Sequence, residues 1–294
     1  MIDGALLLDK AVGLSSNAAL QQAKRLFGAR KAGHAGTLDP LASGLLLVLF
    51  GEATKFAGPL LDADKEYLAT LRLGATTTTG DAEGEVLERR EVKTDEKLIQ
   101  QALGRFRGEI EQIPPMYSAL KRNGVPLYKL ARRGEEVERA PRPVVISELE
   151  LLKRAADEVD LRIRCSKGTY IRSLAQDIGA ALGTGAHLSA LRRTASGGFR
   201  IEEAATLEAL EAMTPEQRRR RLLPLADLLA GLPRAELDAQ ATARLRNGQT
   251  LPISGLGEGI CGIYGPGGVV IGLGRCDGAG LHPLRLTQAT EKHR

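Results

Sequence analysis

Hydrophobic and polar positions along the chain follow two different periods, and the shorter period predicts strands. Residues 65–74 alternate strictly and place Tyr67 among the apolar residues of one face, as in a strand with one buried side. Residues 45–50 form a continuous apolar run, which indicates a strand buried on both faces. We also expect a short strand at residues 5–8 and two strands joined by a polar turn at residues 149–165.

Helical segments are marked by polar residues that can cap a first turn and by glycines that end the last one. Residues 15–27 begin with three candidate N-caps and stop at Gly28. The segment from Thr169, a candidate N-cap, to Gly183 is expected to form a turn and then a helix. Further helices are expected at residues 95–103, 127–133 and 203–212.

The order of these elements favours an α+β fold. Strands and helices mix without regular βαβ alternation, so we predict a mixed, mostly antiparallel sheet flanked by helices. After Pro233 the chain changes to a short helix and Gly-rich strands with a hairpin signal. We therefore predict two domains, residues 1–232 and a small β-rich domain at 233–294. An irregular basic insertion is expected at about residues 114–143 of the first domain.

Composition narrows the class of protein without deciding its function. The 294 residues are 43% hydrophobic and 26% charged, as in a soluble globular protein. The longest apolar run is too short to span a bilayer, and no signal peptide is recognisable, so we expect a cytoplasmic protein without a membrane partner. The three cysteines are widely spaced, which argues against a disulfide framework and against a metal cluster: Cys165, Cys261 and Cys276.

The charge pattern leaves two interpretations open. The formal net charge of +5 is a weak argument for nucleic-acid binding by itself. Basic pairs recur along the chain, however, and end in a run of four arginines at residues 218–221. They could converge on one face that follows a phosphate backbone, or they could be unrelated solvated helix faces.

The strongest candidate for chemistry is Asp39, in the segment RKAGHAGTLDPLASGLLLVLFGEATKF at residues 30–56. Glycines before it and Pro40 after it restrict the turn, and the apolar strand that follows would mount the carboxylate at the edge of a sheet. His34 lies five residues earlier on the same turn. An isolated Asp-Pro is, however, most often a turn or a helix N-cap, and a lone His beside glycines is usually structural.

Two tyrosines and an arginine are the next candidates. Tyr67 is expected to point inward from its strand, where its alternative is ordinary core packing. Tyr170 stands at a helix start, two residues before Arg172, whose guanidinium could pair with and orient Asp39. The alternative for Arg172 is a surface salt bridge.

Other motifs exclude several classes of enzyme. Residues 257–262 fit the dinucleotide pattern G-x-G-x-x-G, but they precede a strand and no helix follows, so we interpret the match as false. The chain contains no P-loop lysine motif, no H-E-x-x-H and no Cys/His cluster.

Residues 30–56 resemble the signature of the TruB family of bacterial tRNA pseudouridine-55 synthases over more than twenty gapless positions. The resemblance extends over about residues 4–200, through GALLLDKAVGLSSN, KEYLATLRLG, MYSALKRNGVPLYKLARRG, SKGTYIRSLAQDIG and GAHLSALRRTASGGF. Two positions depart from the pattern: Ala11 replaces a usual Pro, and Thr78 replaces a frequent Asp of the polar loop, in which Asp81 remains.

The resemblance implies a fold and a set of site residues. It implies the pseudouridine synthase fold, an RNA-clasping insertion at 114–143 and a PUA-like RNA-binding domain at the C-terminal end. It makes Asp39 the catalytic carboxylate and His34 the residue that fills the gap left by the extruded uridine. The remaining residues of the implied uridine pocket are Tyr67, Tyr170, Arg172 and Leu191.

The implied reaction is the isomerisation of uridine 55 to pseudouridine in the T loop of tRNA. It is redox-neutral and adds no water, so we expect no cofactor and no metal. Whether Asp39 acts as nucleophile or as base stays open at this point. The expected partner is the T arm of tRNA, bound by a monomer without an obligate protein partner. The alternatives are a tRNA-binding protein that remodels tRNA without chemistry and a guide-directed synthase.

Overall fold

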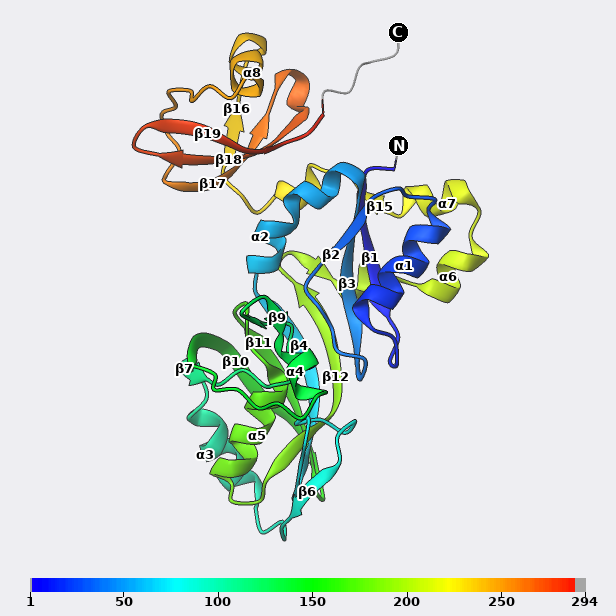
Figure 1. Cartoon of the computed structure of the whole chain (residues 1–294), viewed down its shortest axis with the longest axis vertical. Coiled ribbons are helices and arrows are strands. Elements are labelled where there is room, and N and C mark those ends of the chain that lie inside the picture. The colour runs from blue at the N-terminus through cyan, green and yellow to red at the C-terminus, as the bar shows by residue number, and fades with distance from the viewer. Residues whose placement is uncertain (1, 289–294) are drawn as a thin grey trace.

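The computed structural model describes residues 2–288 of the chain, so the last six residues of the predicted second domain lie outside the described part. Figure 1 shows a larger body built on one long sheet and, at its upper left, a smaller β-rich unit. None of the helices in the described residues is long and apolar enough to cross a membrane.

The long sheet runs in the order β14-β1-β3-β12-β4-β11-β10-β7, with β2, β13 and β15 attached at its side. Only β1 with β14 and β3 with β12 pair in parallel, so the predicted mixed, mostly antiparallel sheet is confirmed. The strands are β1 (Gly4–Lys10), β2 (Ala32–Ala35), β3 (Ala42–Phe50), β4 (Lys65–Leu73), β7 (Gly108–Gln112), β10 (Arg142–Ala155), β11 (Glu158–Cys165), β12 (Ala186–Ser196), β13 (Phe199–Arg200), β14 (Ala205–Thr206) and β15 (Leu222–Leu223).

Helices cover the two halves of this sheet separately. In one half, α1 and α6 pack on one face of β1 and β3, and η1 and η3 pack on the other. In the other half, α3 and α5 cover β4, β10 and β11. The helices are α1 (Ser16–Leu26), η1 (Gly51–Phe56), α2 (Ala57–Asp62), α3 (Glu96–Gly104), α5 (Ile171–Ala181), η2 (Ile201–Glu203), α6 (Leu207–Ala212), α7 (Pro215–Arg220) and η3 (Asp227–Leu229).

The ends of these helices test the capping predictions. Ser15 caps α1 by accepting a hydrogen bond from the Ala18 N–H, and Asp95 caps α3 in the same way. The Thr169 prediction was wrong: the N-cap of α5 is Tyr170, and the Thr169 hydroxyl donates instead to the Ser166 carbonyl. The backbone N–H of Tyr170 is satisfied by the Gln112 side chain, which no local sequence pattern could reveal.

Several predicted boundaries also change. Pairing with β7 starts β10 at Arg142, seven residues before the predicted strand. The helix expected at 203–212 is confined to α6, because a 3₁₀ turn and the short β14 occupy its first residues. The polar loop after β4 contains a small hairpin of β5 (Ala75–Thr77) and β6 (Val86–Arg89).

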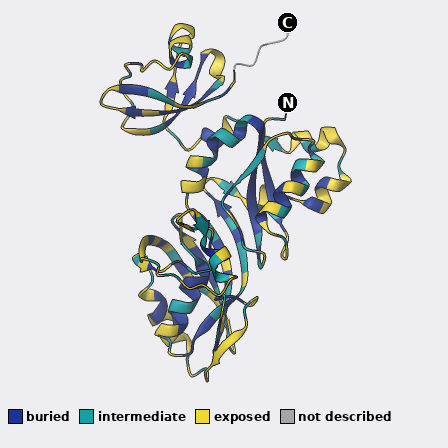
Figure 2. Ribbon diagram, in the orientation of Figure 1, coloured by how far each residue is buried: buried dark blue, intermediate teal, exposed yellow. Residues whose placement is uncertain are grey.

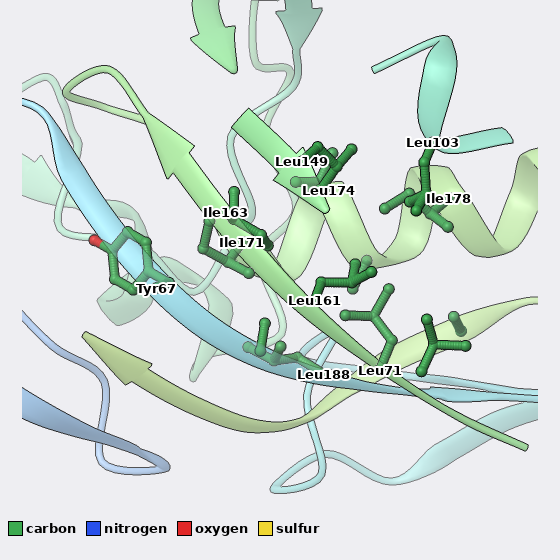
Figure 3. Close-up of a cluster of buried hydrophobic side chains, with 14 of the residues drawn as sticks. Tyr67, Leu71, Leu103, Leu149, Leu161, Ile163, Ile171, Leu174, Ile178 and Leu188 are labelled. Atoms are coloured by element: carbon green, nitrogen blue, oxygen red, sulfur yellow. The ribbon is translucent and has the colours of Figure 1, made fainter. Parts of the chain in front are cut away.

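Three clusters of buried side chains lie along the long sheet, one in the half around β4 and β11 and one on each face of β1 and β3. Figure 2 shows the strands mostly buried and the outward faces of the helices exposed. In β4 the burial alternates as the sequence predicted, with Tyr67 only 9% exposed. Figure 3 shows Tyr67 at one end of a cluster of leucines and isoleucines, with its hydroxyl oxygen turned away from them. The ring of Tyr67 therefore packs in the core, and its hydroxyl group lies at the edge of the core.

The basic insertion has only short elements of regular structure, whereas the C-terminal unit has a sheet of its own. The insertion holds β8 (Lys121–Arg122), β9 (Val125–Pro126) and α4 (Leu127–Ala131). The C-terminal unit is a four-stranded sheet in the order β16-β17-β18-β19, and its Gly257–Gly262 motif runs into a strand, which agrees with rejection of a dinucleotide site. Its elements are β16 (Arg234–Glu236), α8 (Ala239–Arg246), β17 (Gly259–Tyr264), η4 (Pro266–Gly268), β18 (Val270–Asp277) and β19 (Gly280–Leu286).

One feature of the long sheet creates the site. The edge of β3 opposite β1 is shared by two strands: β12 pairs with residues 42–44 and β2 with residues 47–50. The loop from β2 to β3 must therefore emerge where β12 takes over from β2. This loop carries Asp39, so the carboxylate lies at the junction of the two halves of the sheet.

Candidate active site

The turn that carries Asp39 is fastened from several sides. The buried Ser16 hydroxyl accepts a hydrogen bond from the Leu38 N–H at 2.7 Å and donates to the Leu38 carbonyl at 2.9 Å. The Gly13 N–H donates to the Pro40 carbonyl, and the Ala42 N–H closes the turn on the Asp39 carbonyl. Because every backbone neighbour of Asp39 is tied down, its carboxylate has a fixed direction.

Arg172 projects from the first turn of α5 and meets that carboxylate. One guanidinium nitrogen, Nη2, lies 3.0 Å from Asp39 Oδ2. The Arg172 side chain is only 5% exposed, and it also donates to the carbonyls of Thr79 and Tyr117. The pairing of Arg172 with Asp39 that the sequence suggested is therefore present, and it is not a surface salt bridge.

Asp81 is a site residue that sequence reasoning placed only in the polar loop. Its Oδ2 lies 3.7 Å from Arg172 Nε, and its side chain is 4% exposed. Thr79 and the backbone N–H of Glu83 also donate to this carboxylate. A buried carboxylate on the far side of the guanidinium holds Arg172 in place, and the three groups form one chain, Asp81–Arg172–Asp39.

The surroundings change the proton affinity of Asp39. Burial raises the pKa of its carboxyl above the ordinary value, whereas the Arg172 guanidinium acts to lower it. The side chain nevertheless keeps 41% exposure, so a substrate can reach it. Lys10, fully buried beneath the turn, has its pKa lowered by burial to about 8, and the Asp39 carboxylate acts in the opposite direction.

A cavity of about 270 Å³ opens beside Asp39. Its walls bring together five of the six residues expected at the site: Asp39, Tyr67, Tyr170, Arg172 and Leu191. They come from a loop, β4, the start of α5 and β12, so segments far apart in the sequence meet at one place. A cavity of this size is on the scale that holds one small ligand or a single extruded base.

Both tyrosines in this wall keep their phenolic protons at neutral pH. Burial raises the pKa of Tyr67 and of Tyr170 above the ordinary value. The hydroxyl groups are therefore neutral hydrogen-bonding groups, and the rings offer flat apolar surfaces. Leu191 adds an aliphatic wall.

His34 lies outside the lining of this cavity. It is part of β2, paired with Val48 of β3, and not on the Asp39 turn as the sequence suggested. Its Nδ1 is buried and has no hydrogen-bond partner among the described residues. Burial lowers the pKa of its imidazole, so the ring is neutral at pH 7.

Two further cations of the wall escaped sequence reasoning. Arg193 and Lys65 line the cavity, although Lys65 was seen only as the first residue of a strand and Arg193 only as half of a basic pair. Arg193 follows Leu191 by two residues in β12, so the alternation of the strand places both side chains on the face of the cavity. Within residues 2–288, no group of three or more His, Cys, Asp or Glu side chains could hold a metal ion.

A carboxylate paired with a buried arginine, beside a tyrosine in a base-sized cavity of this α+β fold, defines the pseudouridine synthase class. Known structures support that class: a Cbf5-Nop10-Gar1 complex matches with a TM-score of 0.74 at 30% identity, covering 94% of this chain and 78% of that chain. An H/ACA RNP bound to a substrate RNA matches with a TM-score of 0.75 at 26% identity, covering 98% and 86%.

Family models then narrow the class. The TruB family pseudouridylate synthase N-terminal domain matches residues 24–171, the tRNA pseudouridylate synthase B C-terminal domain residues 172–230, and the pseudouridine synthase II TruB C-terminal domain residues 233–287. The chain belongs to the TruB family of pseudouridylate synthases, as its motifs suggested.

Curated relatives agree over nearly the whole length. The tRNA pseudouridine synthase B of Burkholderia mallei (strain NCTC 10247) is 54% identical over 292 residues, 97% of each chain. The protein of the same name from Aromatoleum aromaticum is 55% identical over 287 residues, 97% of this chain and 93% of the relative.

Proposed function

We propose that this protein isomerises uridine 55 to pseudouridine in the T loop of tRNA. The observation that carries the proposal is the Asp39–Arg172 pair at the mouth of the cavity, in a chain 54% identical to a tRNA pseudouridine synthase B. The relatives' name supplies the tRNA substrate, and the TruB resemblance supplies position 55.

The reaction starts with extrusion of the target base. A base stacked in the T loop cannot reach Asp39, so the uridine turns out of the RNA into the cavity. His34 lies on β2 outside the cavity lining, where a neutral, flat ring can fill the space that the base leaves. Tyr67 then stacks on the uracil, and Tyr170 and Leu191 complete the pocket.

Asp39 attacks next, and its chemical role has two forms. As a nucleophile it bonds to C1′ of the ribose; as a base it removes a ribose proton. In both forms the N1–C1′ bond breaks and the base turns. C5 then bonds to C1′, as the bond from Asp39 to C1′ breaks in the first form or as Asp39 returns the ribose proton in the second. The C5 proton leaves and N1 gains one, so the product is an isomer of the substrate.

Arg172 and the walls of the cavity serve this chemistry. The guanidinium opposes the effect of burial on the pKa of Asp39, so it favours the ionised carboxylate that either role requires. The base is free of the sugar during part of the reaction, and walls that exclude water protect the ribose from hydrolysis in that interval.

We propose further that the enzyme works alone, as a cytoplasmic monomer. The related H/ACA and Cbf5 structures are complexes with other proteins or RNA. The relatives that are more than 50% identical to this chain, however, are named tRNA pseudouridine synthase B. That name favours a stand-alone enzyme over a guide-directed one.

The test is incubation of an unmodified tRNA transcript with the purified protein alone, followed by mapping of pseudouridine at each position. We expect one pseudouridine, at position 55. Binding without product would favour the non-catalytic tRNA-remodelling alternative. Product only after addition of a guide RNA or of further proteins would favour the guide-directed alternative.

A further inference from the structure

Arg193 is the most deeply buried arginine of the described chain and lines the cavity from β12. It is 1% exposed, and its Nε donates to the Leu45 carbonyl at 2.7 Å. Its Nη2 donates to the Gly36 carbonyl at 3.0 Å. The guanidinium thus joins β12 to β3 and to the segment that leads into the Asp39 turn.

Within residues 2–288, no carboxylate forms an ion pair with this guanidinium. The nearby acidic groups are engaged elsewhere: Asp39 and Asp81 face Arg172, and Asp9 pairs with Arg192. A buried cation without a counter-ion is unfavourable for folding. Such a charge in a cleft therefore calls for a ligand that supplies the opposite charge.

The other unpaired cation of the wall, Lys65, already has a structural explanation. Its ammonium group donates to three carbonyls at the end of α2, those of Leu60, Leu61 and Ala63. Three carbonyls satisfy all three N–H bonds of an ammonium, in the manner of a helix C-terminal cap. Arg193 has five N–H bonds, and its two backbone carbonyls and the Tyr67 side chain do not use all of them.

Nη1 of Arg193 donates to neither of these carbonyls, and it lies close to the backbone of Gly36. Gly36 has a φ of +94°, and a Cβ added there would lie 3.2 Å from Nη1. The same arginine lies opposite Tyr67 in the pairing of β12 with β4. Its charge and a side-chain hydrogen bond oppose the effect of burial on the Tyr67 pKa. Arg193 therefore belongs to the part of the wall that a uracil stacked on Tyr67 would contact.

The reaction supplies the missing charge for a limited time. When N1–C1′ breaks, the bonding electron pair stays on the base, whether Asp39 acts as nucleophile or as base. The uracil is then an anion, with its charge spread over N1, O2 and O4. Bonding of C5 to C1′, loss of the C5 proton and protonation of N1 remove that charge again.

We propose that Arg193 is a further catalytic residue, whose guanidinium binds the uracil anion and stabilises it between cleavage and rejoining. This inference rests on the proposed function and adds a second charged group to it. Arg172 acts on Asp39 at the sugar, whereas Arg193 acts on the departing base. A donor that is already in place for a developing charge needs no reorganisation during the reaction.

The test compares two target nucleotides in the same tRNA. Fluorine at C5 withdraws electrons, so 5-fluorouracil is the better leaving anion and needs less stabilisation. Single-turnover consumption of the target nucleotide is measured for uridine and for 5-fluorouridine. Arg193→Met should slow the uridine substrate by about 10²- to 10³-fold. It should slow the fluorinated one by an order of magnitude less.

Two variants separate charge stabilisation from loop support. Arg193→Lys retains a cation and should keep the substrate ratio near that of the wild type, which also covers the case that Arg193→Met does not fold. Arg192→Met is the matched control, because Arg192 pairs with Asp9 and is 40% exposed. It should leave the ratio unchanged.

If Arg193→Met slows both substrates equally, Arg193 only supports the loop. The same conclusion follows if Arg193→Lys shifts the ratio of the two substrate rates as far as Arg193→Met does. An inactive wild-type protein would instead contradict the proposed function itself. The two failures are therefore distinguishable.

Discussion

The cavity around Asp39 and the core of the C-terminal sheet accommodate charged side chains in opposite ways. At the cavity, Arg172, Asp81 and Arg193 are each no more than 5% exposed. In the C-terminal sheet the buried cluster is apolar, and ion pairs such as Arg234–Glu236 stay at the surface, with side chains 51% and 73% exposed.

The difference shows where the fold tolerates unfavourable burial. Buried charges weaken folding unless they are paired and hydrogen-bonded, so an apolar core is the simpler solution. The C-terminal sheet has such an apolar core. Charges buried at the cavity act more strongly on a group bound there, because low local polarity strengthens electrostatic interactions. Cations that hold RNA phosphates need no burial, since they work through counterion release at the surface.

The largest effect should come from the carboxylate at the mouth of the cavity. Asp39→Asn keeps the shape but removes both nucleophile and base, so single-turnover formation of pseudouridine should fall by at least about 10⁴-fold. RNA affinity should be retained. Asp157→Asn, at an exposed carboxylate that pairs with Arg72, is the matched control and should be near normal. Turnover by Asp39→Asn within tenfold of the wild type would contradict the assignment.

Arg172→Met should have the next largest effect, because it leaves Asp39 and the buried Asp81 without their cation. We expect a loss of about 10³-fold in rate and about 3 kcal/mol in the free energy of unfolding. The sign of the pH effect is defined: activity falls as pH drops through the Asp39 pKa, and loss of Arg172 raises that pKa further. The acid limb of the pH–rate profile should therefore move to higher pH.

The control for that substitution is Arg162→Met, which removes an exposed pair with Glu150. It should change neither stability nor the pH profile by a measurable amount. An unshifted acid limb in Arg172→Met would mean that Asp39 is not the group whose ionisation limits the rate.

Substitution of His34, which lies outside the cavity lining, tests the extrusion of the base rather than the chemical step. His34→Ala should slow the reaction on folded tRNA by about tenfold, since base extrusion breaks stacking worth a few kcal/mol. It should have less effect on a loosened T-loop fragment, where little stacking is broken. Single-turnover rates of His34→Ala on the two RNAs measure this difference. Equal slowing on both RNAs would show that His34 does not fill the space left by the extruded base.

Surface cations of the C-terminal sheet should act on binding alone. Arg275 and Arg285 are exposed, and neither forms an ion pair within the described residues. Replacing both by Gln should weaken tRNA binding severalfold and lower the slope of log affinity against log salt by about two. The single-turnover rate at saturating enzyme should stay constant. Lys93→Gln, already neutralised by Glu91, is the control.

The smallest effect is expected inside the C-terminal core. Cys261 and Cys276 are free, and their sulfur atoms lie 3.6 Å apart. Burial raises the Cys261 pKa to about 12, so the thiol should resist alkylation in the native protein and react only in denaturant. Cys261→Ala should cost about 1 kcal/mol in the free energy of unfolding and leave the reaction rate unchanged. Rapid native labelling would show that this core opens.

The approach of Cys261 to Cys276 shows one limit of the sequence. They are fifteen residues apart, and only the antiparallel pairing of β17 with β18 brings them together. The register in which two such strands pair depends on contacts across the sheet, and no local sequence pattern specifies those contacts.

What the sequence determined by itself is local. Alternation in residues 65–73 predicted a strand with Tyr67 inward, and Ser15, Asp95 and Gly183 marked helix ends correctly, because these signals act within one turn or one strand. The motif around Asp39 also selected the residue that the fold places at the cavity mouth.

Only the tertiary structure decided which distant groups share the site. Asp81 stands behind Arg172 because α5 packs beside the polar loop, and Tyr170 replaces Thr169 as N-cap because Gln112 of β7 reaches its N–H. Arg193 reaches the segment before Asp39 because β12 pairs with β3 at residues 191–193, which brings its guanidinium to the carbonyls of Gly36 and Leu45. Burial and the partner of a charged side chain are properties of surfaces joined by folding, so residue order alone does not determine them.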